Sequence, residues 1–172
     1  MILSFKTQIN GTPTYFVEKI HSGLLQNGVT DFDGISFENR NFDLKKLTRS
    51  EPKIHTIRTD KKNRWKAGMM IDFFINARQK DMFRFAPRIE VFSIENIEIV
   101  HSDFHGDKGY DKGSWVLIDN IVISSCWVDT LARNDGFEST GDFFDYFNED
   151  FKGKIIHWTD HQYMPEEIND YE

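Results

Sequence analysis

The sequence has a single cysteine, Cys126, so no disulfide can form within the chain. It also has no apolar run near the roughly 18 residues that a membrane-spanning helix needs. Its first residues, Met1–Lys6, lack the basic and then apolar layout of a secretory signal peptide. These absences together predict a cytoplasmic protein that has no membrane partner.

Internal repeats, low-complexity tracts and Gly/Ser- or Pro-rich linkers are absent as well, which predicts one domain over residues 1–172. A chain of 172 residues can bury a sizeable core without disulfides or metals. Hydrophobic residues make up 39% and charged residues 28%, a profile typical of a globular protein and not of a disordered one. Sixteen phenylalanines predict a core rich in aromatic rings.

Positive charge is scarce overall, because 21 Lys and Arg face 28 Asp and Glu and the net charge is −7. This balance argues against a general duplex-binding protein, which needs many basic contacts to phosphates. The exception is residues 43–66, where nine Lys or Arg stand against three acids, a local charge of +6. A positive patch on a negative body favours an anionic ligand, whereas the simpler interpretation is a solvated, lysine-rich edge strand and loop.

Within the basic patch, residues 53–58 read Lys-Ile-His-Thr-Ile-Arg and alternate as an extended strand does. Lys53, His55 and Ile57 are expected to point one way, and Ile54, Thr56 and Arg58 the other. A polar loop, residues 59–66, follows and contains Arg64 and Trp65. Trp65 has two open interpretations: it stacks on a base at the rim of a ligand site, or it fills the edge of the core.

Hydrophobic spacing predicts the other elements. Helices are expected over 15–25 and 138–147, the second with a capping box of Ser139 and Asp142, and one or two helical turns over 127–132. Strands are expected over 2–6, 69–76 and 154–163, and residues 83–90 and 91–100 are expected to form one or two further strands. His21, on the first helix, is predicted to be a surface residue.

Three stretches are harder to interpret. Residues 26–52 are predicted to be an ordered insertion with a short helix near 43–48. Residues 101–113 are predicted to be a long polar loop, whose His and Asp spacing fits no metal-ligand pattern. His157 and His161 share a face of the last predicted strand but have no third ligand nearby, so no metal site is expected.

Several of these motifs, taken together, resemble those of a known family. Lys53-x-x-Thr56-x-Arg58, followed by a basic loop, Gly68 and the strand Met70–Phe74, looks like the signature of the ASCH domain. Residues 1–5 are similar to the opening strand of the family, and residues 15–20 to its first helix. Residues 134–139 are similar to its acidic-Gly-Phe turn, and residues 153–158 to the endings of bacterial and phage copies. The resemblance covers most of the chain but not residues 26–52.

The resemblance implies an α+β fold of the PUA-like superfamily, a mostly antiparallel β-barrel with flanking helices and a cleft over the strand that contains Lys53. The family is thought to bind RNA or nucleotide-like ligands. Some compact members hydrolyse the amide of acylated cytidine nucleosides with the equivalents of Lys53 and Thr56 and a carboxylate. That carboxylate is Asp135 here, where those members carry Glu, which is one methylene longer.

Two hypotheses of function follow, and neither requires a cofactor. The first is a module that binds RNA, a nucleotide or a nucleoside in a basic cleft formed by Lys53, Thr56, Arg58, Arg64 and Trp65. The second is a nucleoside amidohydrolase with Lys53, Thr56 and Asp135 as catalytic residues. In the second, threonine needs a base, and lysine serves only if burial or neighbouring cations lower its pKa. The simplest alternative is a plain salt bridge between Lys53 and Asp135.

Overall fold

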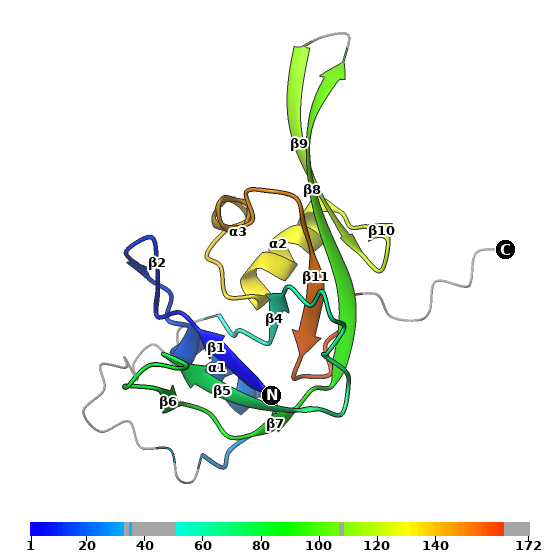
Figure 1. Ribbon diagram of the computed structural model, residues 1–172. Coiled ribbons are helices and arrows are strands. Elements are labelled where there is room, and N and C mark those ends of the chain that lie inside the picture. Colours follow the sequence, from blue (N-terminus) through cyan, green and yellow to red (C-terminus); the bar gives the residue numbers. More distant parts are fainter. Residues whose placement is uncertain (33–34, 36–50, 107–108, 164–172) are drawn as a thin grey trace, which may run out of the picture.

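The structure, a computed structural model, describes residues 1–32, 35, 51–106 and 109–163, with only the backbone path for 102–106 and 109–112. Within these ranges the chain is α+β, with three helices and mostly antiparallel strands (Figure 1). The helices are α1 (Phe16–Gln26), α2 (Ser125–Asn134) and α3 (Thr140–Tyr146). None of these helices has the length and apolar character needed to cross a lipid bilayer.

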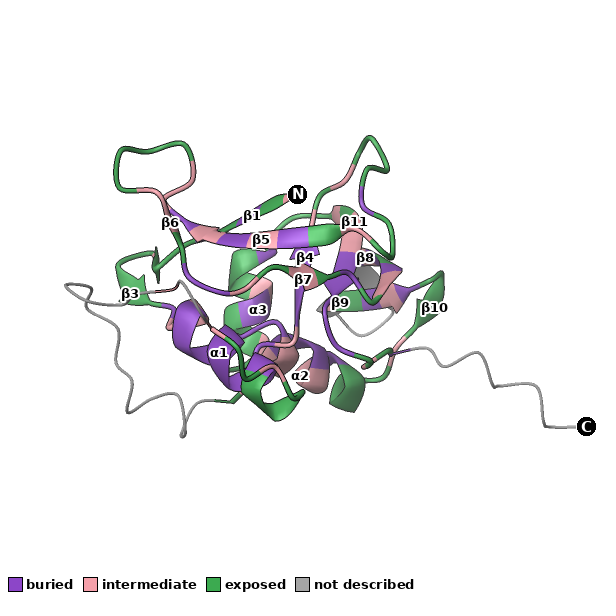
Figure 2. Ribbon diagram, turned by 90° about the horizontal axis from the view of Figure 1, so that it is seen from below, coloured by how far each residue is buried: buried purple, intermediate pink, exposed green. Residues whose placement is uncertain are grey.

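The smaller of the two main sheets has four strands around β5 (Met70–Ile75). β1 (Ile2–Phe5) runs parallel to β5, while β6 (Phe83–Arg84) and β7 (Ile89–Glu90) pair with it in the antiparallel sense. The burial pattern of β5 alternates strictly, since Ile71, Phe73 and Ile75 are buried. Figure 2 shows α1 as a largely buried helix in the same part of the molecule.

The larger sheet has five antiparallel strands in the order β10-β9-β8-β11-β4. Their bounds are β4 (His55–Arg58), β8 (Ser93–Gly106), β9 (Gly109–Ile118), β10 (Ile121–Val122) and β11 (Phe151–His157). Figure 1 shows β8 and β9 running on beyond the other strands as a long two-stranded arm. A small hairpin of β2 (Gln8–Ile9) and β3 (Thr12–Pro13) completes the strands.

The described strands form three separate sheets and do not close into a barrel. Closure requires continuous ladder hydrogen bonds around the ring of strands. No such ladder joins the sheet of β5 to the sheet of β11, and five of the described strands are only two residues long. The α+β class and the mostly antiparallel sheets predicted from the sequence are therefore confirmed, whereas the barrel is not seen.

Two clusters of buried side chains form the core. One gathers around β1, β5 and α1, and the other around β8, β9, α2 and α3. β11 contributes to both, because the adjacent residues Ile155 and Ile156 point to opposite faces of the sheet and enter different clusters. The segment before β4 forms backbone hydrogen bonds to α1 and to α2, one helix from each cluster.

Several predicted elements are confirmed with small shifts at their ends. The helix expected over 15–25 is α1, and the strand expected over 69–76 is β5. The helix expected over 138–147 is α3, and the Ser139 half of its capping box is present: the Ser139 side chain accepts a hydrogen bond from Asp142 N at 3.1 Å. The Asp142 carboxylate accepts from the Ser139 hydroxyl at 2.7 Å. The helical turns expected over 127–132 extend to the ten residues of α2.

Three predictions are wrong. Residues 101–113 are mostly strand, because backbone pairing of β8 with β9 continues from Ile97–Ile118 to Gly106–Gly109 and requires no apolar side chains. His21 is buried, and it is satisfied there by a contact of 2.5 Å between its Nε2 and the Phe85 carbonyl oxygen. The last strand begins at Phe151 and ends at His157, so residues 158–163 do not belong to it.

The predicted insertion at 26–52 falls largely outside the described residues. The helix expected near 43–48 lies entirely outside them.

Candidate functional site

The site is centred on a buried ion pair between two segments that are far apart in the sequence. Lys53 lies just before β4, and Asp135 follows the last residue of α2. Lys53 Nζ lies 2.6 Å from Asp135 Oδ1 and also donates to the Asp135 carbonyl oxygen. The two side chains are only 1% and 7% exposed, so bulk water does not screen the pair.

Backbone contacts hold Lys53 between two helices. Lys53 N donates to Lys19 O of α1 at 3.0 Å, and Ile54 N donates to Asn134 O of α2 at 3.0 Å. α1 approaches so closely that a Cβ on Gly23 would come within 2.6 Å of the Lys53 carbonyl oxygen. Glycine at position 23, which weakens the helix in isolation, is therefore what allows α1 to pack against this segment.

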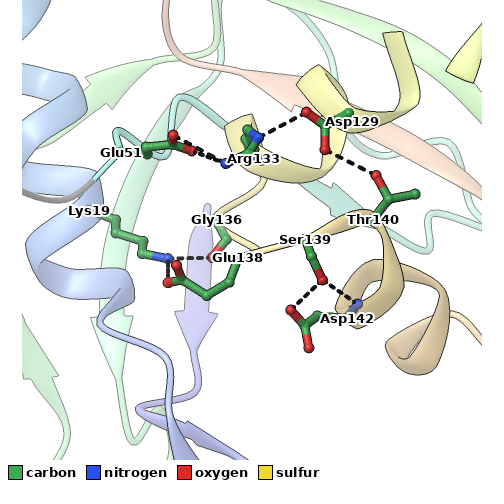
Figure 3. Close-up of polar contacts among 9 residues, drawn as sticks. All are labelled: Lys19, Glu51, Asp129, Arg133, Gly136, Glu138, Ser139, Thr140 and Asp142. Carbon is green, nitrogen blue, oxygen red and sulfur yellow. Dashed lines mark hydrogen bonds and ion pairs between the residues drawn. The ribbon is translucent and has the colours of Figure 1, made fainter. Parts of the chain in front are cut away.

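The side chain of Lys19 holds the turn that presents Asp135 against α1, as Figure 3 shows. Lys19 Nζ donates to Gly136 O at 2.8 Å and lies 2.5 Å from Glu138 Oε1. Gly136 has a φ of +92°, and a Cβ there would meet Phe16 at 2.9 Å and the Lys53 stem at 3.1 Å. Only glycine suits this position, both for its backbone conformation and for the space beside Lys53.

A second pair of contacts in Figure 3 fixes the end of α2. Arg133 Nε lies 2.9 Å from Asp129 Oδ2, and Arg133 Nη1 lies 3.2 Å from Glu51 Oε2. Thr140 Oγ1 of α3 donates to Asp129 Oδ1 at 3.2 Å. These exposed contacts tie α2 to α3 and to the segment that leads into Lys53.

Burial decides the direction of the pKa shift of Lys53, whereas neighbouring groups decide that of Asp135. Desolvation lowers the pKa of Lys53 to about 8, with Asp135 opposing the shift and the cations Arg58 and Lys19 adding to it. Burial by itself raises the pKa of Asp135, but Lys53 and His55 outweigh burial and the pKa is lowered. Asp135 is therefore ionised at neutral pH, whereas Lys53, with a pKa of about 8, is partly in its neutral form there.

Buried polar groups other than Lys53 also surround the Asp135 carboxylate. Ile57 N donates to Asp135 Oδ1 at 3.1 Å, and His55 Nδ1 lies 3.6 Å from the same oxygen, which is too far for a hydrogen bond. His55 Nε2 lies 2.7 Å from Tyr163 Oη, which accepts from Asn134 Nδ2 at 2.9 Å. Burial lowers the pKa of His55 to about 3, so the ring is neutral.

Sequence reasoning did not assign this supporting role to His55 or Tyr163. The alternation of residues 53–58 put His55 on the face of Lys53, which was a usable signal. The sequence held no such signal for Tyr163, because its contact with His55 joins residues 108 positions apart. His157 is also buried here and lies 2.6 Å from Glu95 Oε2, so it faces the interior and not solvent.

A cavity of about 230 Å³ opens above the ion pair. Three of its polar groups come from Lys53, Thr56 and Asp135, and Arg58 lies at its side. Its apolar wall is aromatic and aliphatic, formed by Ile9, Phe16, Ile57, Phe137, Tyr146 and Phe147. Lys53 and Thr56 line the same cavity despite their opposite places in the predicted alternation, because β4 begins only at His55 and Lys53 precedes it.

Two donors at this cavity have unused capacity. Arg58 Nη2 donates to Ser4 O at 2.9 Å, but Arg58 Nε is buried and has no hydrogen-bond partner in the described part of the chain. Thr56 is 3% exposed, and across the described ranges its hydroxyl makes no hydrogen bond. A buried donor such as Arg58 Nε is rarely left unpaired, so its presence in a residue that lines a cavity is typical of a ligand site.

The other two predicted ligand-binding residues lie elsewhere. Trp65 is 5% exposed and packs in the core cluster of β1, β5 and α1, which selects the second of its two interpretations. Its backbone N donates to Asp60 Oδ2 at 2.8 Å. Arg64 is exposed and lies 3.9 Å from Asp60 Oδ1. The structure brings together Lys53, Thr56, Arg58 and Asp135, and leaves Arg64 and Trp65 outside the cavity lining.

Together, the fold and the site define an α+β protein with a buried Lys–Asp pair at the floor of a small, aromatic-walled cavity. A scan against protein-family models and searches of curated proteins and of solved structures found no match.

Proposed function

We propose that this protein is an ASCH-type domain of the PUA-like superfamily whose cavity binds a nucleoside or the nucleoside part of a nucleotide or RNA. The observation that supports this proposal is that Lys53, Thr56, Arg58 and Asp135 line or flank one cavity. The first three are the motif residues of the sequence resemblance, and the fourth comes from its acidic-Gly-Phe turn. Residues 53–58 and 135 meet only in the folded chain.

The size and walls of the cavity support a ligand of this kind. Its volume of about 230 Å³ lies just below the range of about 300–1,000 Å³ usual for small-molecule sites, which favours one small, flat ligand. Phe16, Phe137 and Tyr146 present aromatic rings on which a base can stack. Arg58 and Thr56 offer donors for ring or carbonyl oxygens, and Lys6 adds positive charge at the cavity.

Titration of the protein with cytidine, N4-acetylcytidine and a single-stranded oligoribonucleotide tests this proposal. We expect the nucleosides to bind with an affinity that changes less than about twofold between 50 and 200 mM salt, because an uncharged ligand releases no counterions. Arg58→Gln should weaken that binding, while Arg78→Gln, which alters an arginine outside the cavity lining, should not. If neither nucleoside nor the oligoribonucleotide binds to the folded protein, the proposal is refuted. Tight, steeply salt-dependent binding of the oligoribonucleotide alone would identify the ligand as RNA and not a free nucleoside.

A second candidate function, hydrolysis of an acylated cytidine, is favoured by one observation: the pKa of Lys53 is lowered to about 8. A lysine with such a pKa is partly neutral near physiological pH and can act as a general base. Asp135 holds its Nζ in place, and Thr56 contributes a hydroxyl to the same cavity.

The hydrolysis would proceed in two stages. Neutral Lys53 takes the proton of the Thr56 hydroxyl as Oγ1 attacks the amide carbonyl carbon, and Arg58 stabilises the resulting oxyanion. The C–N bond then breaks, and the departing exocyclic nitrogen of cytosine takes the proton from Lys53. Lys53 then takes a proton from water as the water oxygen attacks the Thr56 ester carbon. The C–Oγ1 bond breaks, Lys53 returns that proton to Thr56 Oγ1, and the carboxylic acid is released with Thr56 and neutral Lys53 restored.

Thr56→Ala separates binding from turnover. If Thr56 is the nucleophile, we expect the rate of acetate release from N4-acetylcytidine to fall by at least about 10³-fold, while Kd changes less than about threefold. Thr56→Ser should retain measurable turnover because it keeps a hydroxyl. Equal rates for wild type and Thr56→Ala would exclude the nucleophile assignment, and no acetate release by wild type would exclude hydrolysis of this substrate.

A further inference from the structure

A second cavity adjoins the first at its outer side. Its volume is about 220 Å³, and it lies between the β2–β3 hairpin and α3. The two cavities share four wall residues, Ile9, Phe16, Phe137 and Tyr146. A ligand whose base occupies the inner cavity therefore has room to extend a substituent along these walls into the outer one.

The two cavities carry opposite charge. In the inner cavity the Lys53–Asp135 pair is neutral overall, which leaves the positive charges of Lys6 and Arg58. In the outer cavity Glu138 pairs with Lys19 at 2.5 Å, which leaves the negative charges of Asp142 and Asp145. No Lys or Arg is among the described residues that line the outer cavity.

The inner cavity supplies independent signs of a ligand. Arg58 Nε is buried without a hydrogen-bond partner, and the Thr56 hydroxyl, on a residue that is 3% exposed, also makes no hydrogen bond in the described ranges. Both belong to residues that line this cavity. These two donors suit the carbonyl oxygens of an acylated base, so we expect that end of the ligand in the inner cavity. The other end of the ligand would lie beside α3, next to carboxylates.

We propose that the ligand is a nucleoside whose acyl substituent ends in a positively charged amine, with the acylated base in the inner cavity and the amine beside Asp142 and Asp145. This inference rests on the proposed nucleoside-binding function and adds the charge of the substituent. The carboxylates attract the ammonium group, and the shared aromatic walls pack against the methylenes of the acyl chain.

The test compares two probes of nearly equal size, N4-(β-alanyl)cytidine and N4-butanoylcytidine, which differ by an ammonium group in place of a methyl group. Kd is measured with wild type and with Thr56→Ala, in which turnover does not consume the probes. We expect the β-alanyl probe to bind about fivefold more tightly, as suits partly exposed ion pairs. The preference should shrink as salt concentration rises.

Asp145→Asn identifies the source of the preference, with Glu149→Gln as a matched control on an exposed acid outside both cavities. We expect Asp145→Asn to reduce the fivefold preference to about twofold, and Glu149→Gln to leave it unchanged. Equal binding of the two probes, or a preference that Asp145→Asn leaves intact, would overturn the inference while the nucleoside-binding proposal stands. If N4-acetylcytidine and both probes fail to bind while cytidine binds, the inference is also overturned. If cytidine and the oligoribonucleotide fail to bind as well, the proposed function fails and the inference with it.

Discussion

Lys53→Met is expected to lower the free energy of unfolding by about 3–5 kcal/mol and to abolish nucleoside binding. The variant leaves the Asp135 carboxylate buried, with Ile57 N as its remaining hydrogen-bond donor of those described above. A charge taken out of water without its partner is far more costly than a surface charge. Methionine keeps most of the stem that packs beside Phe16, so the loss reports the ammonium group and not a cavity. Urea unfolding of wild type and variant measures this change in the free energy of unfolding.

Two further variants make this result interpretable. Lys152→Met removes an exposed lysine that also has an ion pair, 2.7 Å from Glu98, and should change stability by less than about 1 kcal/mol. Lys53→Met with Asp135→Asn removes both charges and should recover more than half of the loss, because the amide oxygen of the introduced asparagine still accepts from Ile57 N. If Lys53→Met is as stable as Lys152→Met, the pair is not held in a buried, unscreened environment.

If the protein is a hydrolase, its rate of acetate release should rise about tenfold per pH unit below pH 8 and level off above it. The pKa of Lys53 is lowered to about 8, so the neutral form that serves as base increases tenfold per unit below that value. If the protein only binds, affinity for an acceptor-rich ligand should instead fall above pH 8, where Lys53 loses its charge. A pH series from 6 to 9.5 of kcat/KM and Kd distinguishes the two outcomes.

The midpoint of this pH dependence can be assigned to Lys53 because the neighbouring titratable groups do not change charge over the same pH range. His55 has a pKa of about 3 and stays neutral across the whole series, and Asp135, whose pKa is lowered, stays ionised. Raising the salt concentration should move the midpoint little, because the pair is shielded from solvent. A midpoint near 10.5, the ordinary value for lysine, would contradict the burial of Lys53 on which both candidate functions depend.

The elements that were predicted correctly are those with strong local signals. α1 and β5 follow from apolar residues at helical and strand spacing, and the start of α3 follows from Ser139 and Asp142. The β8–β9 arm was missed because a two-stranded ribbon is held by backbone hydrogen bonds and leaves no apolar pattern to detect. His21 was misplaced because its contact with Phe85 O crosses 64 positions of the chain.

The amino-acid sequence by itself pointed to the candidate residues of the site. The resemblance to the ASCH family singled out Lys53, Thr56, Arg58 and Asp135, and a lowered pKa follows as the requirement if Lys53 is catalytic. The same reasoning left Trp65 with two interpretations and included Arg64, because spacing along a loop does not say which side chains turn inward.

Tertiary structure alone decided which of these residues meet and in what medium. The Lys53–Asp135 contact joins residues 82 positions apart, and its length and burial depend on how α1, α2 and β4 pack. The pKa of Lys53 follows from that burial, since desolvation is a property of everything that surrounds a charge and not of its neighbours in the chain. The adjoining acidic cavity has the same origin, because β2, β3 and α3 come together only in the folded protein.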